Sequence, residues 1–482
     1  MLFHANRFHL LVFVAWQFTI FFATQQIFPI FSNYVPKWRC GESEPFGKNC
    51  SAYLACEGKP QFEDIAFHSA ALEFDWVCGP RAYLASLFSQ IQFAGVLCGT
   101  FLYGTLSDCL GRRPIALLAL VSGVIFTVLS GMAPNWQILF IARFFVGLAV
   151  GGDVVVVMTY VMELILPEQR IVLRGFFNWG IARLMLTTIC YFFREWRQAS
   201  IVCSVAALPA FIIVLVFFPE SPTWLHNKRK LVEMRKSEEK IARIAGVNCV
   251  EVDHPDLEKN EDFRSLLKDP ALAKRLFVLW LMWFVACMSS YGNDLNSNSL
   301  SGDLFLNQVL FAIFITISKF ILVIVDTYKS DFSRRNLHQY SQAVVCTCFF
   351  SLTVLIILEY QGPAMLLVNL IGTVFIEYTW DACYLCAIEA MPTNMRGSSV
   401  GSCSLVARVG ALLSPILPFL NSIWGPSAFL TVAVVGLVNL VTSYFFLVET
   451  KGINLDAVKI HEEDVEEEEE QMDMLKKENG NA

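Results

Sequence analysis

The sequence predicts an all-α polytopic membrane protein with twelve transmembrane helices in two six-helix halves. Three observations predict this fold: the composition is apolar, long apolar segments recur, and charged motifs at their ends repeat at a nearly constant interval. Of the 482 residues, 55% are hydrophobic and only 16% are charged, whereas a soluble globular protein carries about 25% charged residues. This composition excludes a nucleic-acid-binding protein, a collagen-like fibre and a small disulfide scaffold.

The apolar segments are long enough to span a bilayer. A helix needs about 20 mainly apolar residues to cross a hydrocarbon core of about 30 Å, and an open sheet edge has no partner for its polar groups in lipid. The predicted spans lie near residues 10–31, 83–106, 115–132, 137–157, 173–193, 199–218, 275–297, 303–325, 341–359, 364–386, 398–419 and 426–447.

Charged motifs at the span ends indicate that the second half of the chain repeats the first. Three pairs of residues occur in the same order, at intervals of 222, 226 and 229 residues: Arg112 and Arg334, Glu163 and Glu389, and Glu220 and Glu449. Both six-helix units start and end on the same side of the membrane. Parallel repeats of this kind place a substrate site near mid-membrane, between the halves.

The distribution of basic residues predicts the orientation. With the N-terminus inside, 25 of the 36 Lys and Arg residues fall in cytoplasmic segments, as the positive-inside rule requires. We expect both termini in the cytoplasm and a location in the plasma membrane. The predicted parts are a first half (1–218) with an extracellular loop (32–80), a cytoplasmic linker with short helices (219–273), a second half (274–448) and an acidic tail (449–482).

The first loop carries the signs of an oxidising, extracellular setting. Four of the fifteen cysteines lie in it: Cys40, Cys50, Cys56 and Cys78. Four cysteines allow two disulfides in three pairings, and the sequence leaves the pairing open. The Asn49-Cys50-Ser51 sequon lies in the same loop, so we expect a glycoprotein modified at Asn49.

Several motifs resemble those of a known family. Gly104-x3-Asp108-x2-Gly111-Arg112-Arg113 is similar to the loop motif of the major facilitator superfamily. Three further segments resemble its organic ion transporter branch, solute carrier family 22: Glu73 to Cys78 (EFDWVC), Arg143 to Leu148 (RFFVGL) and Pro219 to Leu225 (PESPTWL). The resemblance extends to about residue 452 and implies the twelve-helix major facilitator fold.

The resemblance also implies a set of gating charges at the cytoplasmic helix ends. There, opposite charges bridge the halves and interact with helix dipoles. The expected gating residues are Asp108, Arg112, Glu163, Arg170, Glu220, Arg334, Glu389, Arg396 and Glu449. The alternative is that these charges only set the topology.

Charges within the spans are candidates for substrate binding, because each costs at least a few kcal/mol at the bilayer centre unless it is paired or hydrated. Lys319 and Arg408 resemble the basic positions of organic anion transporters, where they would pair with a substrate carboxylate. Alternatively, Lys319 pairs with Glu377 or Asp381, and Arg408 has an internal partner too.

Two further charges and three aromatic residues complete the candidates. We expect Arg183 to pair with Asp153 inside the first half. Tyr291, Trp179 and Tyr378 are candidates for the wall of a cavity suited to flat organic solutes. The alternative for each aromatic residue is packing against lipid or a neighbouring helix.

These observations predict a transporter rather than an enzyme. The chain has no phosphate-binding loop, no metal-ligand spacing and no nucleophile–base pattern, so we expect no cofactor and no metal. The expected partners are a small organic ion and the lipid bilayer. We expect alternating-access transport of organic anions or carboxylate-bearing zwitterions. The alternatives are an organic cation carrier, a sugar-porter-like facilitator, and a non-transporting receptor of the same fold.

Overall fold

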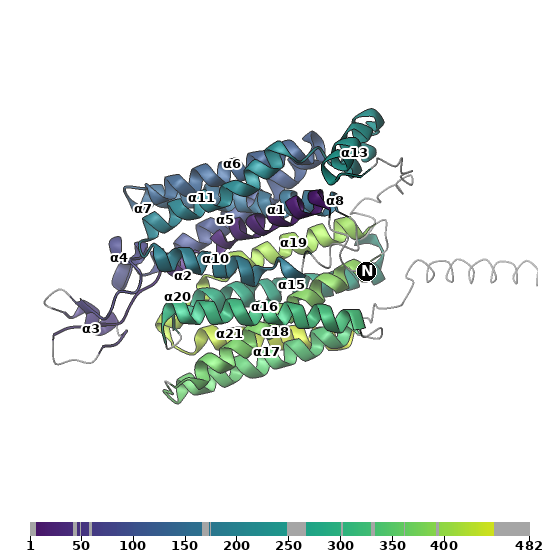
Figure 1. Cartoon of the computed structure of the whole chain (residues 1–482). Coiled ribbons are helices and arrows are strands. Elements are labelled where there is room, and N and C mark those ends of the chain that lie inside the picture. The colour runs from purple at the N-terminus through teal and green to yellow at the C-terminus, as the bar shows by residue number, and fades with distance from the viewer. Residues whose placement is uncertain are drawn as a thin grey trace, which may run out of the picture.

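The computed structural model describes residues 6–41, 46–48, 50–56, 60–165, 173, 175–247, 267–299, 302–328, 333–360, 362–391 and 395–447. Its long helices run along one common direction and form two groups side by side (Figure 1). The short helices α3 (Cys50–Leu54) and α4 (Ala70–Glu73) lie at one end of this bundle, and α13 (Leu231–Ala245) lies at the other. We refer to these as the cap end and the linker end.

The first group contains the helices that precede α13. They are α1 (Arg7–Ala23) with η1 (Thr24–Gln26) and α2 (Pro29–Ser32), α5 (Tyr83–Leu110), α6 (Arg112–Gly131), α7 (Trp136–Gly152) with the π-helical η3 (Asp153–Val157) and α8 (Met158–Glu163), α10 (Trp179–Phe192) and α11 (Trp196–Val216). Asn6, Asn135 and Asn178 cap α1, α7 and α10 by accepting first-turn backbone N–H groups, as polar N-cap residues do.

The second group contains the helices that follow α13. They are α15 (Pro270–Asn296) with η4 (Ser297–Ser299), α16 (Leu304–Tyr328), α17 (Arg334–Ile357), α18 (Ala364–Glu389), α19 (Arg396–Leu413), α20 (Ile416–Ile423) and α21 (Ser427–Phe446). Pro415 separates α19 from α20, because proline cannot supply the N–H that would continue the helical ladder.

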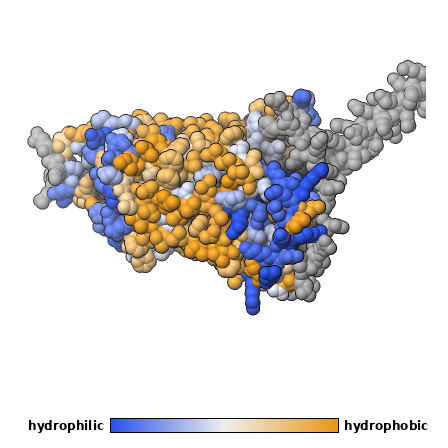
Figure 2. Space-filling view, turned by 90° about the horizontal axis from the view of Figure 1, so that it is seen from above, coloured by the Kyte–Doolittle hydropathy of each residue, from blue (hydrophilic) through white to orange (hydrophobic). Residues whose placement is uncertain are grey.

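The surface of the bundle is a belt of apolar side chains between two hydrophilic ends (Figure 2). Ten helical segments of the described residues are long and apolar enough to cross a membrane. Two more helices belong to the bundle: α10, with 14 residues, and α18, which has 26 residues and carries Glu377 and Asp381. These twelve spans correspond to the twelve that the sequence predicts.

The segment between α2 and α5, which we call the cap, is cross-linked by two disulfides and covers one end of the bundle. Cys40 is bonded to Cys56 and Cys50 to Cys78. The strands β1 (Trp38–Arg39) and β2 (Gln61–Phe62) pair antiparallel within it, and the 3₁₀ turn η2 (Gly79–Arg81) leads into α5. Asn49, the predicted glycosylation site, lies outside the described residues.

At the linker end, α12 (Pro222–Asn227) and α13 attach to the first group. Trp224 Nε1 donates to the backbone oxygen of Asp108, 3.2 Å away. Gly111 ends α5 with a φ of +115°, a conformation that residues with a Cβ rarely adopt, and a Cβ there would meet the Glu220 carboxylate. The turn between α5 and α6 is thus built for close approach of Glu220.

The two groups touch where α10 lies against α16. A Cβ added at Gly180 would meet Thr316 and the backbone oxygen of Ala312. Phe176 and Phe320 extend this contact, with ring centroids 5.1 Å apart. Small residues allow such close approach between membrane helices.

Candidate solute site between the two halves

Lys319, on α16, contacts two carboxylates of α18. Its Nζ lies 3.0 Å from Glu377 Oε2 and 2.7 Å from Asp381 Oδ2. Glu377 and Asp381 are four residues apart, so both side chains project from the same face of α18. Two carboxylates and one ammonium give this cluster a formal charge of −1. Lys319 therefore has the internal partners that the sequence left open as the alternative.

A cavity of about 380 Å³ adjoins this cluster and extends toward the linker end. Helices of both halves form it, and Arg334, at the start of α17, lies on its wall. Lys319 and Asp381 also line it, and half of the other lining side chains are aromatic: Trp16, Phe177, Trp179, Trp380 and Tyr384. Trp179 is the predicted cavity residue among them. Aromatic faces attract cations and flat apolar groups.

Arg408, on α19, has a different environment. Its Nη1 lies 3.5 Å from Gln26 Oε1 of η1, and its Nε is buried without a hydrogen-bond partner in the part of the chain that the structure describes. The same Gln26 oxygen accepts a 2.9 Å hydrogen bond from Tyr291 Oη, and the Tyr291 ring packs on Phe93. Within the described residues, Arg408 has no carboxylate partner.

Tyr378 lies beside the Lys319 cluster rather than in the wall of the cavity. Its hydroxyl donates to the backbone oxygen of Ser318, 3.2 Å away, and its ring packs edge-on against Phe375. This contact links α18 to α16 one residue before Lys319.

Arg183 crosses between the halves instead of pairing within the first. Its Nη1 lies 2.6 Å from Asp294 Oδ1 of α15, and its Nε and Nη2 donate to Gln308 Oε1 of α16 at 3.1 and 2.6 Å. The side chains of Arg183 and Asp294 are 1% and 6% exposed. The expected Arg183–Asp153 pair is therefore wrong, because the partner of Arg183 comes from the opposite half.

Other polar contacts join the halves nearer the cap end. Asn298 Nδ2 donates to the backbone oxygen of Ile30 at 2.7 Å, and Lys48 Nζ donates to the backbone oxygen of Asn298 at 2.9 Å. The first contact ties η4, which follows α15, to α2, and the second ties the cap to the second half. The halves are thus joined on the cap side of the Lys319 cavity.

The charged residues predicted at the linker end of the first half form one network. Arg112 Nη1 lies 2.6 Å from Asp108 Oδ1, and Arg112 Nε lies 3.5 Å from Glu163 Oε1. Glu220 accepts the backbone N–H groups of Arg112 and Arg113 at 2.9 and 3.1 Å. These N–H groups begin α6, where the helix dipole favours an anion.

Two of the corresponding residues of the second half, Arg334 and Glu389, also pair with one another. Arg334 Nε lies 3.2 Å from Glu389 Oε1, and Arg396 begins α19. Arg170 and Glu449 lie outside the described residues. The ion pairs seen here join helix ends of one half, as they do in the first half.

Two further buried charges lie within the first half. Arg143 stacks on the Phe28 ring at 4.4 Å and donates to Gln25 Oε1 at 3.1 Å. Asp153 begins the π-helical turn η3 and is fully buried, and neither of its carboxylate oxygens has a hydrogen-bond partner in the described part of the chain. Helix irregularities of this type are frequent at functional sites.

Sequence reasoning missed Asp294, Gln26 and the aromatic residues Trp16 and Trp380. Asp294 lies inside the predicted span 275–297, so its charge alone was a usable signal. Gln26 and the two tryptophans have no such signal, since their positions depend on contacts between distant helices. Among the described residues, no group of three or more His, Cys, Asp or Glu could hold a metal ion.

Comparisons with known proteins agree with this architecture. Residues 53–461 match the family model described as sugar (and other) transporter. An uncharacterised protein of Caenorhabditis elegans, F23F12.3, is 39% identical over 94% of both chains. The organic cation transporter-like protein of Drosophila melanogaster is 29% identical, over 79% of this chain and 69% of its own. The organic cation/carnitine transporter 4 of Arabidopsis thaliana is 28% identical, over 81% of this chain and 77% of its own.

The fold is also that of solved transporters. An inward-open structure of the xylose transporter XylE from E. coli aligns with a TM-score of 0.67 and 16% identity, over 94% of this chain and 99% of the other. The predicted fold class is thereby confirmed. The chain belongs to the sugar (and other) transporter family, and it is a membrane transporter of the major facilitator superfamily with relatives in solute carrier family 22.

Proposed function

We propose that this protein moves small organic ions across the plasma membrane by alternating access, and that its preferred solutes are zwitterions with a carboxylate at one end and a cationic group at the other. Organic anions with an aromatic body are the neighbouring class. The observation that carries the proposal is the contrast between Arg408, which has no carboxylate partner in the described residues, and Lys319, which has two.

Arg408 supplies the binding group for the carboxylate. A guanidinium presents a planar fork of donors that matches a carboxylate in a bidentate arrangement. In the described region its Nη1 makes the long contact to Gln26, its charge acts on the neighbouring Tyr291 hydroxyl, and its Nε has no acceptor. Because an unpaired cation in a membrane span is costly, a bound carboxylate would stabilise it. Tyr291 shares Gln26 with Arg408 and positions that amide.

The Lys319 cluster supplies the opposite charge. With Lys319 neutralising one of the two carboxylates, Asp381 leaves negative charge at the edge of a cavity walled by Trp16, Trp179 and Trp380. Tryptophan faces and a nearby carboxylate are a favourable environment for an alkylated ammonium group. In this assignment Lys319 sets the charge of the acidic side and does not contact the carboxylate of the solute.

Alternating access would follow from the contacts between the halves. Arg183–Asp294 and Asn298–Ile30 hold the halves together on the cap side, while the solute cavity extends toward the linker end. We assign the cap to the outside and the linker and both termini to the cytoplasm. The gating charges of each half would then meet across the halves when the linker end closes.

The test is solute uptake into vesicles that contain the purified protein. Carnitine, benzoate, tetraethylammonium and glucose represent the zwitterion, anion, cation and sugar classes. Arg408→Gln should lower kcat/KM for carnitine by about 10- to 100-fold, the value of about 1.5–3 kcal/mol for a hydrogen bond to a charged group. Tetraethylammonium uptake should not fall. The matched control is Arg194→Gln, which changes an exposed arginine at the cap end.

Each other result assigns the protein to a different class. Saturable glucose uptake that is indifferent to Arg408→Gln would indicate a sugar-porter-like facilitator. Carnitine binding without saturable flux would indicate a receptor of this fold. Equal carnitine kinetics in wild type and Arg408→Gln would refute the carboxylate site.

An organic cation carrier is the second candidate, favoured by the net negative Lys319 cluster in the aromatic cavity. Such a carrier would take up tetraethylammonium and would not need Arg408. Asp381→Asn should then reduce tetraethylammonium uptake by at least tenfold, with no carboxylate solute transported at all.

A further inference from the structure

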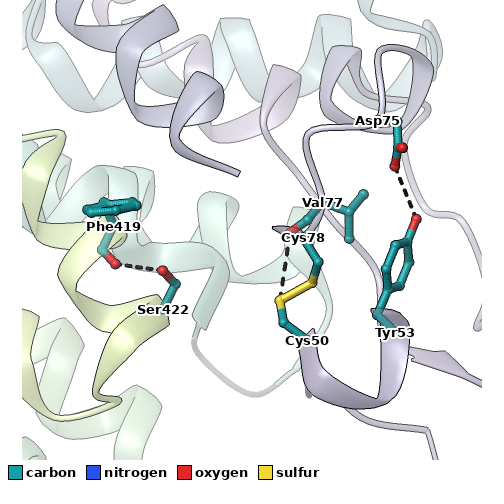
Figure 3. The surroundings of a disulfide bond; sticks show 7 residues. All are labelled: Cys50, Tyr53, Asp75, Val77, Cys78, Phe419 and Ser422. Atoms are coloured by element: carbon teal, nitrogen blue, oxygen red, sulfur yellow. Dashed lines mark hydrogen bonds between the residues drawn. A yellow bond between two sulfur atoms is a disulfide. The ribbon is translucent and has the colours of Figure 1, made fainter. Parts of the chain in front are cut away.

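A second cavity, of about 510 Å³, lies under the cap. The cap, the cap-side ends of α5 and α15, and the α20 region all contribute to its wall. Figure 3 shows the Cys50–Cys78 disulfide of the cap together with Phe419 and Ser422 of α20; Cys50, Phe419 and Ser422 line the cavity. Asp294 of the Arg183 pair directly precedes Leu295 and Asn296 of this wall in α15, and the Gln26–Tyr291 contact belongs to the Arg408 region.

Three asparagine side chains of this wall present unsatisfied acceptors. The Oδ1 atoms of Asn33, Asn298 and Asn421 are buried and have no hydrogen-bond partner in the described part of the chain. For Asn33 and Asn298, the hydrogen bond made by the amide nitrogen fixes the orientation of the side chain. Asn33 Nδ2 donates to the backbone oxygen of Ala85, and Asn298 Nδ2 donates to that of Ile30. Because a backbone carbonyl can only accept a hydrogen bond, the NH₂ group of each amide must face it, and Oδ1 is the other atom.

Asn421 Nδ2 donates to the side-chain oxygen Oδ1 of Asn296 at 3.1 Å, rather than to a backbone carbonyl. Buried polar atoms in proteins are almost always hydrogen-bonded, and each exception calls for an explanation. Three oxygens that lack donors in one cavity indicate an occupant that brings donors.

The cavity wall also carries two hydrogen-bond donors, Trp76 Nε1 and the Lys48 ammonium group. Trp76 Nε1 is buried and has no acceptor in the described residues, although the Trp76 side chain is only 2% exposed. Lys48 contributes an ammonium group, one proton of which is used by the backbone oxygen of Asn298. No Asp or Glu is among the described residues that line the cavity. The wall therefore combines three neutral acceptors with one cation and one indole N–H, beside the Asn296 amide and the hydroxyls of Ser86, Ser89 and Ser422.

We propose that this cavity is a binding site, separate from the Arg408 region, for a small polyhydroxylated carboxylate. Its hydroxyl groups donate to Asn33, Asn298 and Asn421, and its carboxylate accepts from Trp76 Nε1 and pairs with Lys48. A quaternary ammonium ion fits poorly, because it has no donors and meets no anion. The site does not depend on the proposed transport of zwitterions, since neither Arg408 nor any residue of the Lys319 cluster is among the described residues that line it.

The experiment is equilibrium binding of radiolabelled gluconate to the full-length protein in lipid nanodiscs. Gluconate carries five hydroxyl groups and one carboxylate by its formula. Trp76→Phe keeps the ring and removes only the N–H, and Asn421→Ala removes one acceptor. Each should weaken binding about tenfold, the value of one hydrogen bond of about 1.4 kcal/mol, and Lys48→Met by at least as much. Trp280→Phe is the matched control, because Trp280 donates to Ser402 away from this cavity.

Two further measurements distinguish the site from the central one. Arg408→Gln should bind gluconate as wild type does, even if it transports no carnitine. Sorbitol, which has the hydroxyl groups without the carboxylate, should compete at least tenfold more weakly than unlabelled gluconate. A monodisperse gel-filtration profile establishes that each variant is folded.

Three results would overturn the proposal. No saturable gluconate binding to wild type would mean that water alone satisfies the cavity. Binding lost in Arg408→Gln but intact in Trp76→Phe, Asn421→Ala and Lys48→Met would place gluconate in the central site. Equal competition by sorbitol and gluconate would refute the carboxylate–Lys48 pairing.

Discussion

Lys319 and Arg408 lie in the same half of the protein, each inside a membrane-spanning helix, yet their surroundings are opposite. Lys319 contacts Glu377 and Asp381 within 3.0 Å, whereas Arg408 has only neutral neighbours, Gln26 and Tyr291, and no carboxylate partner among the described residues. Both were candidate ligands for a substrate carboxylate on the same kind of signal. The difference shows that a buried charge acquires its role from its neighbours.

The cost of burial explains why this distinction matters. A charged group in a membrane span is destabilising unless it is paired or hydrated. A paired charge such as Lys319 stabilises the fold, and its loss exposes the partner's charge. An unpaired charge such as Arg408 is tolerated where water or a solute reaches it. Removal of a paired charge should therefore lower mainly the stability of the fold, whereas removal of an unpaired charge should lower mainly transport.

The largest effect is expected at the ion pair that joins the halves. Arg183→Met leaves Asp294 buried without its cation, and breaking a buried pair costs about 3–5 kcal/mol. The side chains are 1% and 6% exposed, so solvent screening is slight. We expect the free energy of unfolding, measured by denaturant titration in mixed micelles, to fall by about that amount.

The double variant Arg183→Met/Asp294→Leu is the control for this prediction. Replacing both partners by apolar groups is often nearly neutral, so the double variant should regain most of the lost stability. A double variant as unstable as Arg183→Met alone would mean that the hydrogen bonds to Gln308, and not the charge pair, carry the effect.

A smaller effect is expected at the residues of the comparison itself. Lys319→Met leaves two carboxylates close together without a cation, and should lower the free energy of unfolding by about 2 kcal/mol, because the cluster is partly exposed to water. Arg408→Gln should change stability by less than about 1 kcal/mol, because no partner is left behind. Its effect should appear in carboxylate uptake instead. Equal destabilisation by both variants would abolish the distinction between them.

The sequence accounts for the architecture better than for the partners of its charges. The twelve spans follow from the length of their apolar segments, since only helices satisfy the backbone in lipid. Glu377 and Asp381 are acidic residues of a span in the same half as Lys319, so the sequence leaves their pairing with Lys319 open as an alternative. Nothing local indicates that Arg183 meets Asp294, 111 residues further along the chain and in the other half.

The cap gives a similar lesson. Four cysteines in one loop predict two disulfides, but their pairing depends on how β1, β2 and α3 fold together. The three unsatisfied asparagine oxygens of the cavity under the cap come from segments that are far apart in sequence. No motif brings them together, because their meeting is a consequence of how the cap and the halves pack.

Asp153 extends the comparison to an acidic residue without a partner. Its carboxylate is fully buried, and neither oxygen is hydrogen-bonded within the described residues. An isolated buried carboxylate is so costly that it becomes protonated instead. Asp153→Asn should therefore leave the free energy of unfolding within about 1 kcal/mol of wild type. Asp294→Asn, which removes the charge paired with Arg183, is the matched variant and should be clearly destabilising. Similar losses in the two variants would reveal a partner for Asp153.

The smallest effect is expected where a charge pair is in contact with water. Glu73 of the cap accepts hydrogen bonds from Arg197 Nη2 at 2.5 Å and Trp196 Nε1 at 2.7 Å, and its side chain is 40% exposed. Partial burial alone would raise the pKa of the Glu73 carboxyl, but the hydrogen bonds from Arg197 and Trp196 and the Arg197 charge outweigh burial and lower it.

A lowered carboxyl pKa stabilises the fold above the unfolded value of about 4.3, and the stabilisation is lost as the pH falls through the folded pKa. Glu73→Gln should thus be less stable than wild type at pH 7, by less than about 1 kcal/mol because water screens the pair. Unfolding curves of the two proteins should converge toward pH 3. A difference that persists at pH 3 would assign the effect to the shape of the side chain. Convergence of the curves would show that the Glu73–Arg197 pair, although of the same chemical type as Arg183–Asp294, contributes less to stability. The reason is that water solvates its charges at the cap, whereas the Arg183 and Asp294 charges are buried.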